Sequence, residues 1–250
     1  MTVIFQRTLQ SLVTLILAIA AVASAIFAWQ NTDINKKATL RQTEERVLAE
    51  ITHEYGSRIM QNALVSMWDG YRSFDSDIHE SIRNFLGELI FFRFERDKKF
   101  NLNNLGTPEK HKTYSDHHRR KISQFFLYVW TCYDNGLISP KVLFKLINSG
   151  NTEIIYKILM PIEYCLYWAY KEKYYEEDWP LWMLYKACLE YDLKKGKLKK
   201  SEDLSDWDEY KKTTLDKLIT DNIEDLLRLS RDPERIAEYE KRTGEKLWSA

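Results

Sequence analysis

Apolar residues recur along most of the chain at the spacing of an α-helix, three and four positions apart. Three stretches show the period most clearly: Ile82, Phe85, Leu86, Leu89 and Ile90; Ile122, Phe125, Phe126, Val129, Trp130 and Tyr133; and Leu181, Leu184, Tyr185, Cys188 and Leu189. Such a recurrence places the apolar side chains on one face of a helix, which then packs against a core. No convincing strand alternation occurs, so the sequence predicts an all-α fold.

Turn and capping residues mark where several of these helices begin and end. Asn135-Gly136 is a C-cap pair, and Ser139-Pro140 is the N-cap and first turn of a short helix. Asp178 and Asp232-Pro233 are predicted to open two further helices. Pro161 lies inside an apolar helical pattern and is expected to kink it.

The N-terminal third contains one segment with the length and composition of a membrane span. Residues 12–29 read LVTLILAIAAVASAIFAW and carry no charge. Eighteen residues rise about 27 Å as a helix, close to the thickness of the bilayer hydrocarbon. We therefore expect a single-pass transmembrane helix. A cleaved signal peptide is the alternative, because Ala23-Ser24-Ala25 resembles a cleavage site.

Cations near this segment predict its orientation. Arg7 stands alone before it, whereas Lys36, Lys37, Arg41 and Arg46 follow closely. The positive-inside bias then places the C-terminal part in the cytoplasm, anchored to the inner (cell) membrane.

The predicted organisation has four parts: a membrane anchor at 1–30, a stalk and first bundle helix at 31–70, a core helical bundle at 71–193 and charged C-terminal helices at 194–250. Neither Gly nor Pro occurs between Leu12 and Tyr55, so the membrane helix can continue as a stalk. Asn31-Thr32-Asp33 could instead cap a new helix. Gly56 is expected to weaken the stalk helix without ending it.

Small residues recur within the membrane segment at every fourth position, at Ala20, Ser24 and Ala28. Small side chains at this spacing let two membrane helices approach closely. We therefore expect a homodimer through these residues.

Composition excludes several classes of function. The 37 basic and 37 acidic residues balance, which argues against general nucleic-acid binding. The three cysteines have no CxxC spacing and are interpreted as reduced and structural.

His53-Glu54 and His79-Glu80 begin like HExxH zinc motifs but lack the second His, so no metal or other cofactor is expected. His117 and His118, beside Arg119, are interpreted as the solvated basic start of a helix.

Two stretches resemble a known family. They are IRNFLGELIFF at 82–92 and RRKISQFFLYVWTCYDNGLISPKVLFKLI at 119–147, and they are similar to the bacterial family called domain of unknown function 4760. The resemblance covers residues 10–190 and implies a membrane helix followed by a helical cytoplasmic region. It transfers no catalytic residues.

Two groups of residues are candidates for chemistry or binding. Arg72 and His79 fit the R-x6-H motif of helical ribonuclease toxins, with the Arg holding a phosphate and the His serving as acid or base. A surface loop is the simpler interpretation. The second group is aromatic and could line a ligand groove or pack in the core: Tyr164, Tyr167, Trp168, Trp179 and Trp182.

The leading functional interpretation is a non-enzymatic, membrane-tethered interaction or signalling protein with a bilayer and an unidentified cytoplasmic protein as partners. The family resemblance further suggests that this signalling protein is an accessory of a stress or phage-defence system. The alternatives are a membrane-tethered ribonuclease that uses Arg72 and His79, and a small-ligand sensor that uses the aromatic groove.

Overall fold

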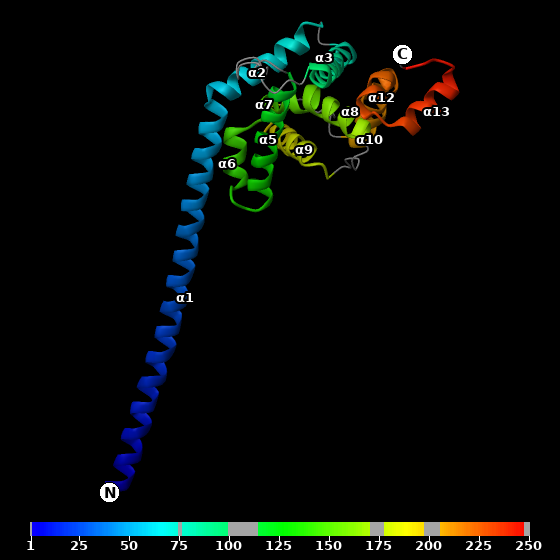
Figure 1. Cartoon of the computed structure of the whole chain (residues 1–250). Coiled ribbons are helices and arrows are strands. Elements are labelled where there is room, and N and C mark those ends of the chain that lie inside the picture. The colour runs from blue at the N-terminus through cyan, green and yellow to red at the C-terminus, as the bar shows by residue number, and fades with distance from the viewer. Residues whose placement is uncertain (1, 75–76, 100–114, 171–177, 198–205, 248–250) are drawn as a thin grey trace. The chain divides into compact units, whose positions relative to one another are not determined.

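The computed structural model describes the chain except residues 1, 75–76, 100–114, 171–177, 198–205 and 248–250. For residues 2–23, 25–26, 91–99 and 115 it describes the backbone and not the side chains. Every regular element in the described part of the chain is a helix, which confirms the all-α prediction (Figure 1).

The first half of the chain contains α1 (Thr2–Gly56), α2 (Arg58–Arg72), α3 (Ile78–Lys99) and α5 (Ser115–Asp134). The middle contains α6 (Pro140–Leu146), α7 (Ser149–Ile154), the π-helical segment η2 (Ile155–Leu159), α8 (Met160–Tyr170) and α9 (Pro180–Lys194). The C-terminal part contains α10 (Trp207–Tyr210), the π-helical segment η3 (Lys211–Leu215), α11 (Asp216–Asp221), α12 (Ile223–Ser230) and α13 (Pro233–Thr243).

The chain divides into two compact units, Met1–Ala49 and Glu50–Ala250. The first unit is helical, and the alternative in which Asn31-Thr32-Asp33 caps a new helix is wrong. Thr32 Oγ1 instead donates to the Ala28 carbonyl at 2.8 Å, and Lys37 Nζ lies 2.6 Å from Asp33 Oδ2. Both contacts span one turn of a continuous helix, and the Asp33–Lys37 pair adds to its stability.

Among the residues that the structure describes, no helix is both long enough and apolar enough to cross a membrane. Most side chains of residues 12–29 lie outside the described residues. Further along the same helix, Phe27, Trp29, Ile34 and Leu40 are exposed.

The second unit begins with the last residues of α1, and the expectation that Gly56 would not end this helix is wrong. The helix stops at Gly56, and Ser57 takes an extended conformation with φ −63° and ψ 143°. The Ser57 side chain accepts a hydrogen bond from the Met60 N–H at 3.2 Å. This N-cap satisfies a free donor of α2 and lets a new helix start at once.

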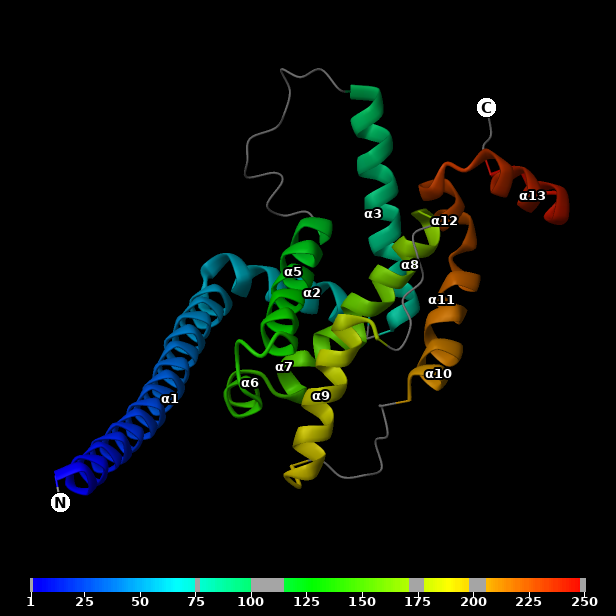
Figure 2. The same cartoon turned by 90° about the horizontal axis from the view of Figure 1, so that it is seen from below.

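Helix α5 lies in the middle of the second unit, and its apolar stripe faces both neighbours. It packs against α2 on one side and against α9 on the other (Figures 1 and 2). Ile122, Phe126 and Val129 are each fully buried in these contacts. The 3.6-residue period predicted this helix and its buried face correctly.

Helix α8 is buried along most of its length and contacts α3, α11 and α12 (Figure 2). The π-helical segment η2 comes directly before it, and the Met160 N–H bonds to the Ile155 carbonyl. Pro161 has no N–H for the carbonyl four residues earlier, and the hydrogen bond just before it spans five residues instead of four. The kink expected at Pro161 stays a prediction.

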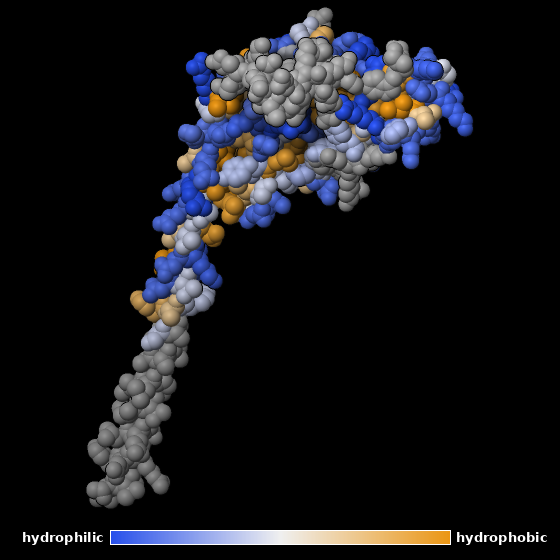
Figure 3. All heavy atoms as spheres, in the orientation of Figure 1, coloured by the Kyte–Doolittle hydropathy of each residue, from blue (hydrophilic) through white to orange (hydrophobic). Residues whose placement is uncertain are grey.

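Polar residues cover most of the described surface on the face seen in Figure 3, with smaller apolar areas between them.

Cys132, Cys165 and Cys188 are all free and buried. Their prediction as reduced thiols is confirmed, and their structural role stays an interpretation. Burial raises the pKa of both Cys165 and Cys188 to about 12, so neither thiol ionises at neutral pH.

Candidate functional site

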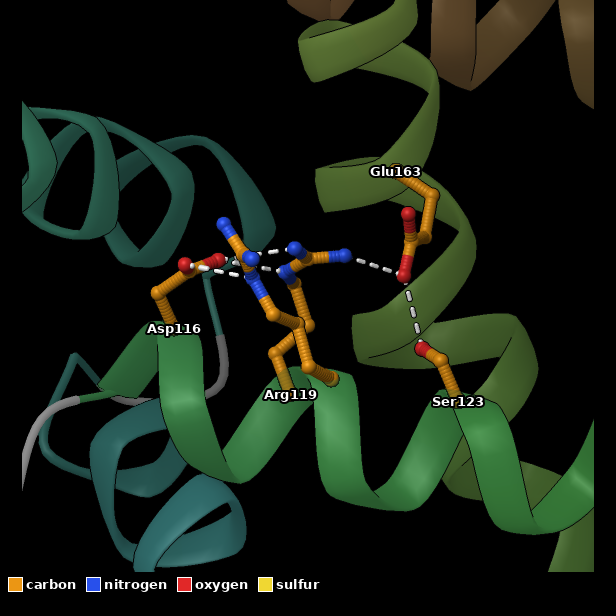
Figure 4. Close-up of polar contacts among 5 residues, drawn as sticks. Asp116, Arg119, Ser123 and Glu163 are labelled. Carbon is orange, nitrogen blue, oxygen red and sulfur yellow. Dashed lines mark hydrogen bonds and ion pairs between the residues drawn. The ribbon is translucent and has the colours of Figure 1, made fainter. Parts of the chain in front are cut away.

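The N-terminal half of α5 and the first turn of α8 bring four polar side chains together in the interior (Figure 4). Asp116, Arg119 and Ser123 occupy one face of α5 because they lie three and four positions apart. Glu163 approaches them from α8. We call these four residues the buried ion cluster.

Arg119 is the centre of the buried ion cluster. Its Nε and Nη2 donate to Asp116 Oδ1 at 2.9 and 2.7 Å, and its Nη1 donates to Glu163 Oε1. The Ser123 hydroxyl donates to the same Glu163 oxygen at 2.7 Å. Arg120 lies outside the cluster, with Nε 2.8 Å from Asp116 Oδ2.

These charges are almost completely removed from solvent. The exposed fraction is 8% for the Arg119 side chain, 7% for Asp116 and 9% for Glu163. Burial by itself lowers the pKa of Arg119, but the charges of Glu163 and Asp116 outweigh it and raise that pKa. Arg119 is therefore fixed as a cation.

The interpretation of this segment as a solvated helix start is wrong for two of its residues. Arg119 and His118 are buried, whereas His117 and Arg120 are exposed. The charges alone did not indicate this, because the partner Glu163 is 44 residues away in the chain.

A pocket of about 340 Å³ opens beside the buried ion cluster. Its walls come from α5, α8 and the start of α9: Arg119, Arg120, Ser123, Gln124, Leu127, Glu163, Leu166, Tyr167, Tyr170, Trp179 and Leu181. This volume is at the lower end of the range for small-molecule sites. Three aromatic rings and three leucines therefore line the pocket together with two arginines and one carboxylate.

The structure separates the aromatic residues of the predicted ligand groove. Tyr167 and Trp179 line the pocket. The Tyr164 hydroxyl donates to Asp216 Oδ1 at 2.9 Å. The central carbon of the Arg235 guanidinium lies 3.8 Å from the centre of the Trp168 ring. Trp182 is fully buried and stacks on Tyr210 with 5.6 Å between ring centroids.

Arg72 and His79, the candidate ribonuclease residues, each have a separate partner. The Arg72 guanidinium lies 5.6 Å from the centre of the Trp68 ring, at the end of α2. His79 Nδ1 lies 2.9 Å from Asp221 Oδ2, which belongs to α11. Neither residue lines the pocket beside the buried ion cluster.

Of the three residues expected to pair membrane helices, Ser24 and Ala28 are exposed on α1. The Ala20 side chain lies outside the described residues. The pairing stays a prediction.

Sequence reasoning missed the buried ion cluster, although one signal was available. Glu163 interrupts an otherwise apolar helix whose neighbours Ile162, Tyr164 and Cys165 are buried. A carboxylate in such a position needs a cation or several donors. That requirement pointed to a partner without identifying Arg119.

No three His, Cys, Asp or Glu side chains in the described part of the chain gather into a group that could hold a metal ion. In comparisons with protein-family models, with curated proteins and with solved structures, nothing matches this chain. The resemblance to domain of unknown function 4760 therefore stays a prediction, and the functional argument depends on the site itself.

Proposed function

We propose that this chain is a membrane-tethered sensor whose helical domain binds a small molecule in the pocket formed by α5, α8 and α9. This proposal joins the signalling role expected from the sequence with the ligand-sensor alternative. Binding at this place would act on the contacts of α5 with its neighbours α2 and α9. A change in those contacts is a means of passing a signal to a protein partner.

The observation that carries the proposal is a buried ion cluster in the wall of a pocket. Burying charged groups costs more than their attraction returns unless the geometry is very good. Charges retained in a concave, aromatic-lined place are typical of binding sites. A merely structural contact between α5 and α8 would need only apolar side chains.

The membrane tether is part of the same proposal. Its support is the charge-free sequence at 12–29 together with the cations that follow it. We propose a cytoplasmic position for the helical domain on the same basis, with pairing of the membrane helices at Ala20, Ser24 and Ala28 as a second element.

The test is ligand protection of the full-length chain in a nonionic detergent. A panel of small amines, nucleosides, carboxylic acids and sugars is screened by thermal unfolding, because a ligand that binds only the folded state raises the midpoint. We expect one class to protect the protein. Protection by no class in the panel would overturn the proposal.

A pair of variants assigns that protection to the pocket. Gln124 is an exposed pocket residue, and Gln124→Trp should fill the cavity and remove the protection. Thr131 is also exposed on α5 but lies outside the pocket lining, so Thr131→Trp should leave protection unchanged. Equal protection in both variants would place the ligand elsewhere and contradict the assignment.

A further inference from the structure

The hydrogen bonds of the buried ion cluster leave one acceptor open. Asp116 uses both oxygens, Oδ1 for Arg119 and Oδ2 for Arg120. Glu163 receives Arg119 and Ser123 on the same oxygen, Oε1. Among the described residues, none donates to Glu163 Oε2, and Figure 4 shows this oxygen turned away from both donors.

Glu163 is the acidic side chain among the described residues that line the pocket. Arg119 and Arg120 also line it, but both are paired with carboxylates: Arg119 with Asp116 and Glu163, and Arg120 with Asp116. The open oxygen of Glu163 is therefore the place where a bound cation would find a charged acceptor.

The rest of the pocket suits an apolar body. Leu127, Leu166 and Leu181 provide aliphatic contacts, and Tyr167 and Tyr170 provide rings. Aromatic faces attract cations as well as apolar groups. An anion would meet Glu163 at short range, and a fully polar ligand would leave the leucines without contact.

We propose that the ligand is a small organic ammonium ion, a protonated primary amine on an aromatic or aliphatic body, whose N–H group donates to Glu163 Oε2. This inference rests on the proposed ligand-sensing function and specifies its chemistry. A charged donor to a charged acceptor is the strongest hydrogen bond that this site offers. The body of the ligand lies against the leucines and rings.

The experiment compares matched probes on the full-length chain in nonionic detergent, by titration calorimetry. The probes share a phenylethyl body: phenethylammonium, its N,N,N-trimethyl derivative, 2-phenylethanol and 3-phenylpropanoate. We expect phenethylammonium to bind at least about tenfold more tightly than the alcohol. The trimethyl derivative has no N–H and should also bind more weakly than the primary amine, and the carboxylate should not bind.

Two variants locate the recognition. Glu163→Gln keeps an oxygen acceptor for Arg119 and removes the charge, and should weaken phenethylammonium about tenfold while 2-phenylethanol is unaffected. Ser123→Ala removes a donor from Oε1 only, so it should change amine affinity far less. A Glu163→Gln protein that retains full amine affinity would overturn the amine assignment.

The outcomes separate this inference from the function on which it rests. Binding of the alcohol or the carboxylate in preference to the amine, lost in Gln124→Trp, refutes the amine assignment and leaves the pocket as a ligand site. Binding of no probe, together with no protection across the broader panel, refutes both.

Discussion

Single residues decide how this protein keeps charges in its interior. Arg119 has two carboxylate partners on different helices, one three residues earlier in α5 and one in α8. Removing the guanidinium would leave both carboxylates buried without a counter-charge. Such a loss is more costly than the net value of the interactions themselves.

We therefore expect Arg119→Met to lower the free energy of unfolding by about 3–5 kcal/mol. The neighbouring Arg120→Met is the control, because that side chain is 62% exposed and its pair with Asp116 should contribute less than about 1 kcal/mol. Urea unfolding followed by circular dichroism measures both. Equal losses in the two variants would mean that burial does not distinguish these cations.

Asp192 is a buried carboxylate outside the buried ion cluster, and it makes stability depend on pH. Its Oδ2 accepts from the Ser149 N–H at 3.0 Å and from the Ser149 hydroxyl at 2.8 Å, and Lys197 lies 3.0 Å from Oδ1. Burial alone would raise the pKa of Asp192, but these donors and the lysine charge outweigh it and lower that pKa.

A lowered pKa in the folded state stabilises the protein above the unfolded-state value of about 3.9. The contribution is lost as the pH falls through the folded-state pKa. Asp192→Asn should therefore cost about 1–3 kcal/mol at pH 7, and the difference from the wild type should shrink toward pH 3. Thermal unfolding across this range measures it, with exposed Asp178→Asn as the control. A gap between Asp192→Asn and wild type that is independent of pH would refute the linkage.

At the scale of elements, the local pattern predicted those features that depend on neighbours in the sequence. The apolar period located α5 and α9, and Asp232-Pro233 located the start of α13. The start of α9 is one residue from the prediction, with Trp179 and not Asp178 at the N-cap. These features follow from propensity and capping, which a short window of sequence contains.

Features that depend on distant partners were not predictable in this way. The salt bridge between Arg119 and Glu163, and the separation of Tyr164 and Trp182 from the pocket, follow from how α8 and α9 pack against other helices. Periodicity shows which face of a helix is buried but not which helix covers it. The aromatic residues therefore indicated that a pocket could exist, but the sequence did not show which of them line it.

Helix α13 offers a test of capping at this scale. Asp232 Oδ1 accepts hydrogen bonds from the N–H groups of Glu234 and Arg235, at 3.1 and 3.3 Å. Asp232→Ala should lower the free energy of unfolding by about 1 kcal/mol, and Asp232→Gly by only a few tenths, because glycine leaves the helix end open to water. Chemical denaturation of both variants measures this. A loss as large for glycine as for alanine would contradict the idea that water replaces the lost bonds at an open helix end.

At the scale of the whole molecule, we propose a helical sensor domain joined to a membrane anchor. The anchor rests on the charge-free residues 12–29. We expect the full-length chain to stay in the membrane fraction after carbonate extraction, at its full mass. A chain that starts at Asn35 should be released, because the apolar segment is gone.

The same fractions distinguish the anchor from a signal peptide. N-terminal sequencing of the membrane-bound chain should find the original terminus, whereas a mature terminus at Ile26 would identify a cleaved signal peptide. Release of the full-length chain by carbonate would contradict the anchor.

The central claim is that the pocket beside the buried ion cluster binds a small organic ammonium ion. The most direct measurement is photolabelling of the full-length chain with a phenethylammonium that carries a diazirine, followed by peptide mapping. We expect labelled residues on α5 and α8, around Leu127, Leu166 and Tyr167. The label should be lost when unlabelled phenethylammonium is added or when Gln124→Trp fills the pocket. Labelling outside the pocket, or labelling that excess phenethylammonium does not reduce, would contradict the claim.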